Sequence, residues 1–315
     1  DMFNPNDIFV SLLGNERLTH LGINLDLYSH FSFRDKLHIN VVYNGEKDLT
    51  KLKDKYDSLN VLSENRGYYA GALDGINASL KNFIESDRSI GVIHNFDYLF
   101  FYDSPFEKLI DDFIQTNKNI CMWKMKNAHP PERAIFQTDC FIITKEFATQ
   151  IYPIVPKDDK TIFYRKALAT AAEGDLDIME EWFFQRLVNV IMPEYLDEFN
   201  NHEYTHEMPQ QHIKRDHNMV MDKLYKYGFF IIGEGPDFAH QIKKHGTVQL
   251  FTTSDDTGHV YDDGVNKGVY DSKYHFIHTH HYEILRPLLI MFKYKLNNKK
   301  FKTIDKFIES KIKLD

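Results

Sequence analysis

The sequence predicts an α/β fold built on a mainly parallel sheet. Short apolar runs alternate with segments of helical pattern through about the first 145 residues, and Asn or Gly follows several of these runs. Helical connections of this kind are what parallel strands require, because a tight hairpin cannot join them. Ligands of such sheets bind beyond the carboxyl ends of the strands. The polar residues that follow each strand are therefore the first candidates for a site.

The expected elements follow one another in a regular order. The predicted strands are residues 7–13, 37–43, 59–62 and 89–93. The predicted helices are a segment ending at residue 29, a lysine-rich segment 47–56, and residues 70–85. Residues 133–143 are expected to form further strands of the sheet.

Composition places the chain among globular proteins. A hydrophobic fraction of 43% with 25 Phe and 18 Tyr in 315 residues excludes a disordered chain, and no apolar run approaches the roughly 20 residues of a membrane span. The net charge of −8 argues against nucleic acid as a partner, because phosphate binding needs a basic face. Cys121 and Cys140 form no CxxC pair and no secretory signal is visible, so we expect a cytoplasmic protein.

The segment ENRGYYAGALDGIN, residues 64–77, lies where a strand should pass into a helix. Glycines at 71 and 75 would let the backbone approach a ligand or a neighbouring element closely, and the start of the helix would favour an anion. The spacing matches neither GxGxxG nor a P-loop. By itself the segment is equally compatible with a helix start whose glycines serve close packing.

A second segment, residues 90–97, ends an apolar strand on Asn95 and Asp97. Alternation along a strand puts these two side chains on the same side. Two oxygen ligands in such an arrangement suit a hard divalent cation, which could in turn hold a diphosphate. Asp103 follows as a further ligand or as a loop residue.

The order of these features resembles the inverting, family-2-like members of the GT-A nucleotide-sugar-dependent glycosyltransferases. In that family the loop after the first strand holds the nucleotide, an N-x-G-like segment follows the third strand, a D-x-D motif ends the fourth, and a late acidic residue opens a helix. The matching segments are residues 12–15, 65–67, 95–97 and 179–187. The resemblance covers roughly residues 5–195 and implies a Rossmann-like mixed sheet flanked by helices, with a C-terminal helical and loop extension. Asn95 stands where the family usually has the first Asp of D-x-D.

The resemblance also implies roles for particular residues. The implied contacts to the nucleotide-sugar donor, with a UDP-sugar favoured, are Leu13, Asn15, Asn44, Asn65, Gly67, Asn95 and Asp97. A divalent cation, Mn²⁺ or Mg²⁺, would bind at Asp97 and Asn95. His278 and His280, an H-x-H pair, would either complete this metal or diphosphate site or belong to an ordinary histidine-rich loop. Glu181 is the first choice for the catalytic base and Glu180 the second. Only one of the two can face the site, because adjacent helical residues point about 100° apart.

The implied function is transfer of a sugar from a nucleotide diphosphate to a saccharide acceptor, with inversion, in glycan or surface polysaccharide biosynthesis. Two alternatives stay open. A sugar nucleotidyltransferase would use a similar sheet, but its glycine-rich basic loop after the first strand is poorly matched by residues 14–17. The chain could also be a non-catalytic carbohydrate-binding protein that kept the fold.

We expect three parts along the chain. Residues 1–195 would form the nucleotide-sugar-binding and catalytic core, and residues 196–290 acceptor-side loops and short elements of the same domain. Residues 291–315 form a basic amphipathic pattern, with eight lysines against three acidic residues. This predicted helix would either dock its apolar stripe on the domain or lie on an anionic membrane surface as a peripheral contact.

Overall fold

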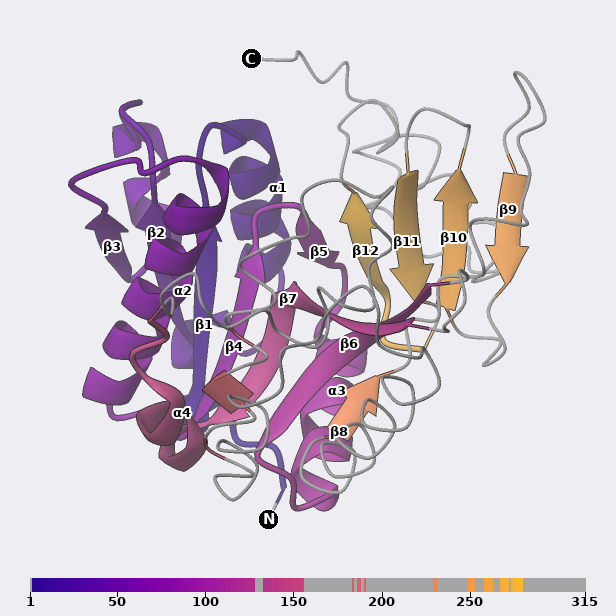
Figure 1. The fold of residues 1–315 in the computed structure, drawn as a ribbon. Coiled ribbons are helices and arrows are strands. Elements are labelled where there is room, and N and C mark those ends of the chain that lie inside the picture. The colour runs from indigo at the N-terminus through magenta and orange to yellow at the C-terminus, as the bar shows by residue number, and fades with distance from the viewer. Residues whose placement is uncertain are drawn as a thin grey trace, which may run out of the picture.

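The computed structural model describes most of the first half of the chain and short segments of the second (Figure 1). The described residues are 2–127, 133–155, 183, 186–187, 190, 229–231, 249–252, 258–262, 267–271 and 273–279. The segments around 180–181 and 291–315, on which several predictions fall, lie outside them.

In the described residues, seven strands form a mixed sheet in the order β3-β2-β1-β4-β7-β6-β8. Their bounds are β1 (Ile8–Gly14), β2 (His38–Tyr43), β3 (Ser58–Val61), β4 (Ile90–Asn95), β6 (Ile120–Asn127), β7 (Arg133–Thr144) and β8 (Phe229–Ile231). The first four strands run parallel to one another, and β7 pairs antiparallel with both β4 and β6. The predicted α/β fold with a mixed, largely parallel sheet is confirmed.

Helices cover both faces of this sheet (Figure 1). Their bounds are α1 (Leu18–Ser29), α2 (Tyr68–Glu85), α3 (Asp103–Gln115) and α4 (Lys145–Ile151). Alternation along β1 divides the core. Phe9 and Leu13 pack on the side of α2 and α4, whereas Val10 and Leu12 pack on the side of α1 and α3. Each such buried side chain contributes roughly 1.5–3 kcal/mol relative to an exposed one.

A second, antiparallel sheet joins the early and late parts of the chain. Its order is β5-β12-β11-β10-β9. The bounds are β5 (Tyr98–Phe100), β9 (Gln249–Thr252), β10 (Gly258–Asp262), β11 (Lys267–Asp271) and β12 (Phe276–Thr279). The strand β5 follows β4 after a short turn, and Leu99 lies opposite Ile277 of β12. This pairing brings residues near 278 to the end of β4.

One predicted element differs from the structure. The lysine-rich segment 47–56, predicted as an α-helix, holds the short 3₁₀-helix η3 (Thr50–Lys55). Asp48 accepts a hydrogen bond from the backbone N–H of Thr50 at 2.8 Å, which favours a local turn over a longer helix. Two further 3₁₀-helices are η1 (Pro5–Asp7) and η2 (Arg34–Lys36).

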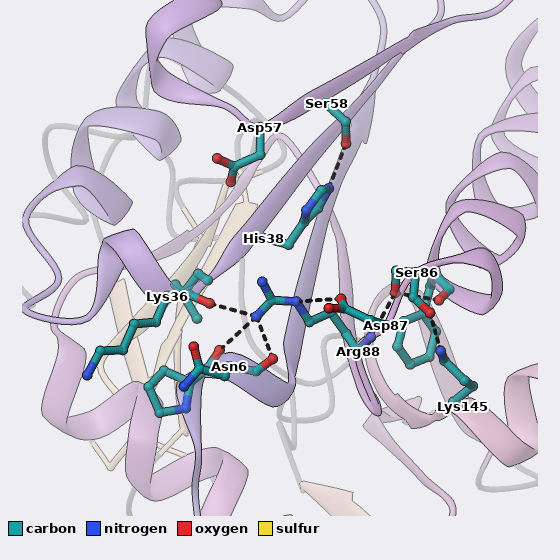
Figure 2. Close-up of polar contacts among 12 residues, drawn as sticks. Asn6, Lys36, His38, Asp57, Ser58, Ser86, Asp87, Arg88 and Lys145 are labelled. Carbon is teal, nitrogen blue, oxygen red and sulfur yellow. Dashed lines mark hydrogen bonds and ion pairs between the residues drawn. The ribbon is translucent and has the colours of Figure 1, made fainter.

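The amino edge of the large sheet is tied together by Arg88 (Figure 2). Its Nη1 donates to the carbonyl oxygens of Asn6 and of Lys36, the latter at 2.7 Å, and its Nε lies 3.1 Å from Asp87. Lys145 donates to the carbonyl oxygen of Ser86 beside it. Arg88 thus joins the starts of β1, β2 and β4 at the edge opposite the predicted ligand site.

No helix among the described residues is both long and apolar enough to cross a bilayer. The predicted C-terminal helix, residues 291–315, lies outside these residues.

Candidate active site

The predicted donor contacts lie together at the carboxyl edge of the four parallel strands. Leu13 is the buried last side chain of β1 before Gly14, and exposed Asn15 follows that strand. Asn44 follows β2 and is 8% exposed, whereas Asn65 follows β3 and is exposed. Because the strands are parallel, their ends converge on one edge.

The segment after β3 forms a compact turn against the end of β2. The Asn65 Oδ1 accepts hydrogen bonds from the Gly67 N–H at 3.0 Å and from the Asn44 amide at 3.4 Å. Gly67 has a φ of +91°, which favours glycine. A Cβ on Gly71 would lie 2.7 Å from the Asn44 Nδ2, so this glycine leaves space for the contact between the two asparagines.

Arg66 ties the same turn to α2. Its Nε and Nη2 donate to the two carboxylate oxygens of Asp74 at 2.7 and 2.5 Å. This paired geometry is the strong form of an arginine–carboxylate contact. The turn is therefore held at both ends, by Asn44 and by Asp74.

The turn after β4 interlocks with the end of β1. The Phe96 N–H donates to the Leu13 carbonyl at 3.0 Å, and the Asn44 N–H donates to the Gly14 carbonyl at 2.9 Å. A Cβ on Gly14 would lie 2.6 Å from the Phe96 ring, so only glycine lets the ring close over the strand end. The loops after β1, β2 and β4 are thereby packed into one unit.

Buried polar groups of α1 hold the β4 turn from beneath. The Asn24 Nδ2 donates to the Phe96 carbonyl at 2.5 Å, and the Tyr28 hydroxyl lies 2.8 Å from the His94 Nε2. The His94 Nδ1 lies 2.8 Å from the Asn95 carbonyl. Burial lowers the pKa of His94 to about 4, so the ring is neutral near pH 7. Since a carbonyl only accepts, Nδ1 carries the proton and Nε2 accepts from Tyr28.

Asp97 is the centre of a charged cluster at this edge. Its Oδ2 lies 2.7 Å from the Arg17 Nη1 and 3.6 Å from the His278 Nε2. The same His278 nitrogen is 3.8 Å from Asp139 Oδ2 on β7. The Asn95 amide donates to the other Asp139 oxygen at 3.1 Å. The cluster thus combines the ends of β1 and β4 with β7 and β12.

His278 reaches this cluster through the second sheet. Its ring stacks on Tyr98 with the ring centres 4.0 Å apart, and the Thr279 N–H donates to the Asp97 carbonyl at 3.0 Å. His278 is 1% exposed. The structure therefore brings the predicted residues Asp97 and His278 together, whereas His280 lies outside the described residues.

No family model and no curated protein sequence matches this chain. Among solved structures, S. aureus TarS 1–349 has a TM-score of 0.38 at 11% identity, over 58% of this chain and 56% of that one. The mannosyltransferase PcManGT from Pyrobaculum calidifontis, in complex with GDP-Man and Mn²⁺, has a TM-score of 0.39 at 13% identity, over 72% of this chain and 74% of that one. A putative glucose-1-phosphate thymidylyltransferase from Bacillus anthracis, in complex with a sucrose, has a TM-score of 0.34 at 11% identity, over 57% of this chain and 83% of that one.

These TM-scores all lie below 0.5, so it is the order and direction of the strands in this chain that support the fold class. Residues 12–15 and 95–97 end β1 and β4, and residues 65–67 follow β3, in the order that the resemblance requires and at one sheet edge. The strand order and the placement of these segments agree with the fold that the resemblance predicts.

The resemblance to GT-A glycosyltransferases predicts a divalent cation, and the described residues can be tested for it. Carboxylates and an imidazole are suitable donors for Mn²⁺. Here, however, the Asp97 oxygen nearest His278 is the one paired with Arg17, and Asn95 offers amide hydrogens to Asp139. The described residues contain no group of three or more His, Cys, Asp or Glu arranged to hold a metal ion. In this arrangement the described residues do not fit a divalent cation.

The predicted base, Glu181, and its alternative, Glu180, lie outside the described residues. The positions that follow them are partly described. Phe183 and Leu187 are helical and buried, and the Phe183 ring lies 5.2 Å from Phe141 in the core. The Arg186 Nε donates to the Ile151 carbonyl at the end of α4, at 2.8 Å. In the segment resembling ED-x-x-x-x-R-L, the arginine therefore has a structural contact.

The predictions from sequence missed four residues around the β4 turn: Arg17 before α1, Asn24 and Tyr28 of α1, and His94 of β4. Arg17 was noted only as part of a poorly matching loop, and Asn24, Tyr28 and His94 carried no motif. The position of Arg17, directly after the first strand and at the same edge as Asp97, is the signal that could have identified it. Asn24 and Tyr28 lie within α1 and His94 lies within β4. The sequence alone does not show whether a polar residue inside a helix or strand is exposed or holds a neighbouring turn from the core.

Proposed function

We propose that the protein is a glycosyltransferase that moves a sugar from a nucleotide diphosphate to a saccharide acceptor. The observation that carries the proposal is the convergence of Asn44, Asn65, Gly67 and Asp97 on one sheet edge, in loops interlocked by hydrogen bonds and by glycines. Such convergence is typical of a ligand site, because a fixed polar surface loses little entropy when it binds.

The chemistry gives each group a task. In an inverting transfer, the acceptor oxygen bonds to the anomeric carbon as the bond to the diphosphate breaks, and a base accepts the hydroxyl proton. We assign this base to Glu181, with Glu180 as the alternative. The residues assigned to the donor site in this proposal are Leu13, Asn15, Asn44, Asn65, Gly67, Asn95 and Asp97. The leaving diphosphate gains negative charge and must meet a cation.

A nucleotide panel tests the proposal. UDP- and GDP-sugars, and UDP and GDP, should raise the melting temperature of the full chain, since a ligand that binds only the folded state stabilises it. Release of UDP or GDP from one of these sugars should then be measurable. Turnover that requires a nucleoside triphosphate with a sugar phosphate would instead identify a nucleotidyltransferase. Binding with no turnover would identify a non-catalytic protein.

The base assignment predicts a specific split between binding and turnover. Glu181→Gln should keep donor affinity nearly unchanged, because the base contacts the acceptor, and should lower turnover by roughly a hundredfold. Steady-state rates and donor affinity, measured on the same preparation, check this. Glu180→Gln is the matched control and should retain most of the activity. Normal turnover in Glu181→Gln would move the role to Glu180 or to another residue.

A further inference from the structure

We infer that Arg17, anchored by Asp97, supplies the positive charge that holds the donor diphosphate, so that donor binding needs no added divalent metal. This inference depends on the proposed function. It assigns Asp97 the role of positioning a guanidinium, in place of the metal contact predicted from D-x-D.

The position of Arg17 fits this role. It immediately precedes α1 in the loop after β1, and the described contacts of its side chain include only the Asp97 ion pair at 2.7 Å. The Arg17 side chain is 47% exposed, whereas that of Asp97 is 10% exposed. One guanidinium nitrogen is therefore fixed by Asp97, while about half of the Arg17 side chain stays accessible to solvent. A guanidinium carries five N–H donors, more than one carboxylate oxygen can accept.

Asp97 is well suited to be an anchor. Its backbone carbonyl accepts from Thr279, and the preceding residue is held by Leu13 and by Asn24. Both sheets and α1 thus fix the backbone that carries the carboxylate. An arginine held in this way presents a planar fork that matches phosphate oxygens, and less conformational entropy is lost on binding than for a free side chain.

Asn95 supports the same conclusion from the charge balance. A second carboxylate at this position would repel a diphosphate unless a metal ion lay between them. The amide carries no charge, and its hydrogens are directed to Asp139 at 3.1 Å. Asn95 therefore adds no negative charge to the carboxylates of Asp97 and Asp139, and the Asp97 charge is paired with the arginine that a diphosphate would approach.

The test measures the affinity of UDP and GDP for the full chain by calorimetry, once in EDTA and once with Mn²⁺. The wild type should bind in EDTA, with an affinity that Mn²⁺ changes little. Arg17→Ala should bind about ten- to a hundredfold more weakly in EDTA, the scale of a lost charge-assisted contact. Arg17→Lys should fall between the two, because it keeps the charge but loses the fork.

Arg34→Lys is the matched control. Arg34 pairs with Asp57 at 3.1 Å in the loops before β2 and β3, at the opposite edge of the sheet. This variant should bind nucleotide as the wild type does. Melting curves of all variants establish that any loss of affinity is not a loss of folding.

Three results would overturn the inference. The wild type could bind only with Mn²⁺, Arg17→Ala could bind like the wild type in EDTA, or Arg17→Ala could bind more tightly with Mn²⁺. The last result would mean that Arg17 merely competes with a metal for Asp97. A wild type that binds no nucleotide in either buffer would instead reject the proposed function, and the inference with it.

Discussion

Glycines mark the positions where loops pack most closely at the carboxyl edge. Gly71 faces the side-chain amide of Asn44, and Gly14 faces the ring of Phe96. Gly22, inside α1, has nothing within 4 Å of the position of a Cβ. Substituting alanine at Gly22 tests only the general cost of glycine in a helix, whereas the same change at Gly71 also tests the packing against Asn44.

Gly71→Ala and Gly22→Ala should have different effects. Gly22→Ala should raise the free energy of unfolding by about 0.5–1 kcal/mol, because alanine loses less backbone entropy, and should keep nucleotide affinity. Gly71→Ala should displace Asn44 from Asn65 and weaken nucleotide binding by about tenfold, the loss of one hydrogen bond. Urea unfolding and nucleotide calorimetry measure both. Wild-type affinity in Gly71→Ala would remove the Asn44–Asn65 turn from the donor site.

At the scale of elements, α1 connects the first strand to the turn after β4. Tyr28 and His94 form a fully buried contact, and burial keeps His94 uncharged near pH 7 by lowering its pKa. The hydrogen bond to the Asn95 carbonyl and the carboxylate of Asp97 both raise the His94 pKa, but burial outweighs them. The turn after β4 therefore keeps this geometry while the His94 ring is neutral, as it is near pH 7.

Stability should depend on pH through His94. The unfolded chain binds a proton near pH 6.5, whereas folded His94 binds one only near pH 4. As the pH falls from 6.5 to 4 the unfolded state gains the proton first, so the free energy of unfolding should decrease, by about 3 kcal/mol at most. Above pH 6.5 this contribution is fully present. Urea unfolding at a series of pH values measures it.

Two variants isolate this dependence. His94→Gln should be less stable at pH 7 by about 1–3 kcal/mol, because buried hydrogen bonds are lost, and should show a flatter decrease towards pH 4. His30→Gln removes an exposed histidine at the end of α1 and should keep the wild-type dependence. Equal slopes for the wild type and His94→Gln would contradict the assignment of a buried, neutral ring.

At the scale of the whole molecule, the sequence predicted what is local. The runs ending near residues 13, 43, 62 and 93 carry apolar patterns with polar ends, and these predicted the strands and the shared edge. The pairing of Leu99 with Ile277 could not be predicted, because it joins segments far apart and leaves no periodic signal. The ion pair of Arg17 with Asp97 also joins distant segments, but the place of Arg17 directly after the first strand was a usable signal.

The most direct test of the account is a crystal structure of the protein with bound UDP or GDP. We predict that the diphosphate lies at the carboxyl edge, with a phosphate oxygen within about 3.5 Å of the Arg17 guanidinium, and that the nucleoside lies beside Asn44 and Asn65. A nucleotide bound at the amino edge near Arg88, or on the second sheet away from Asp97, would contradict the account.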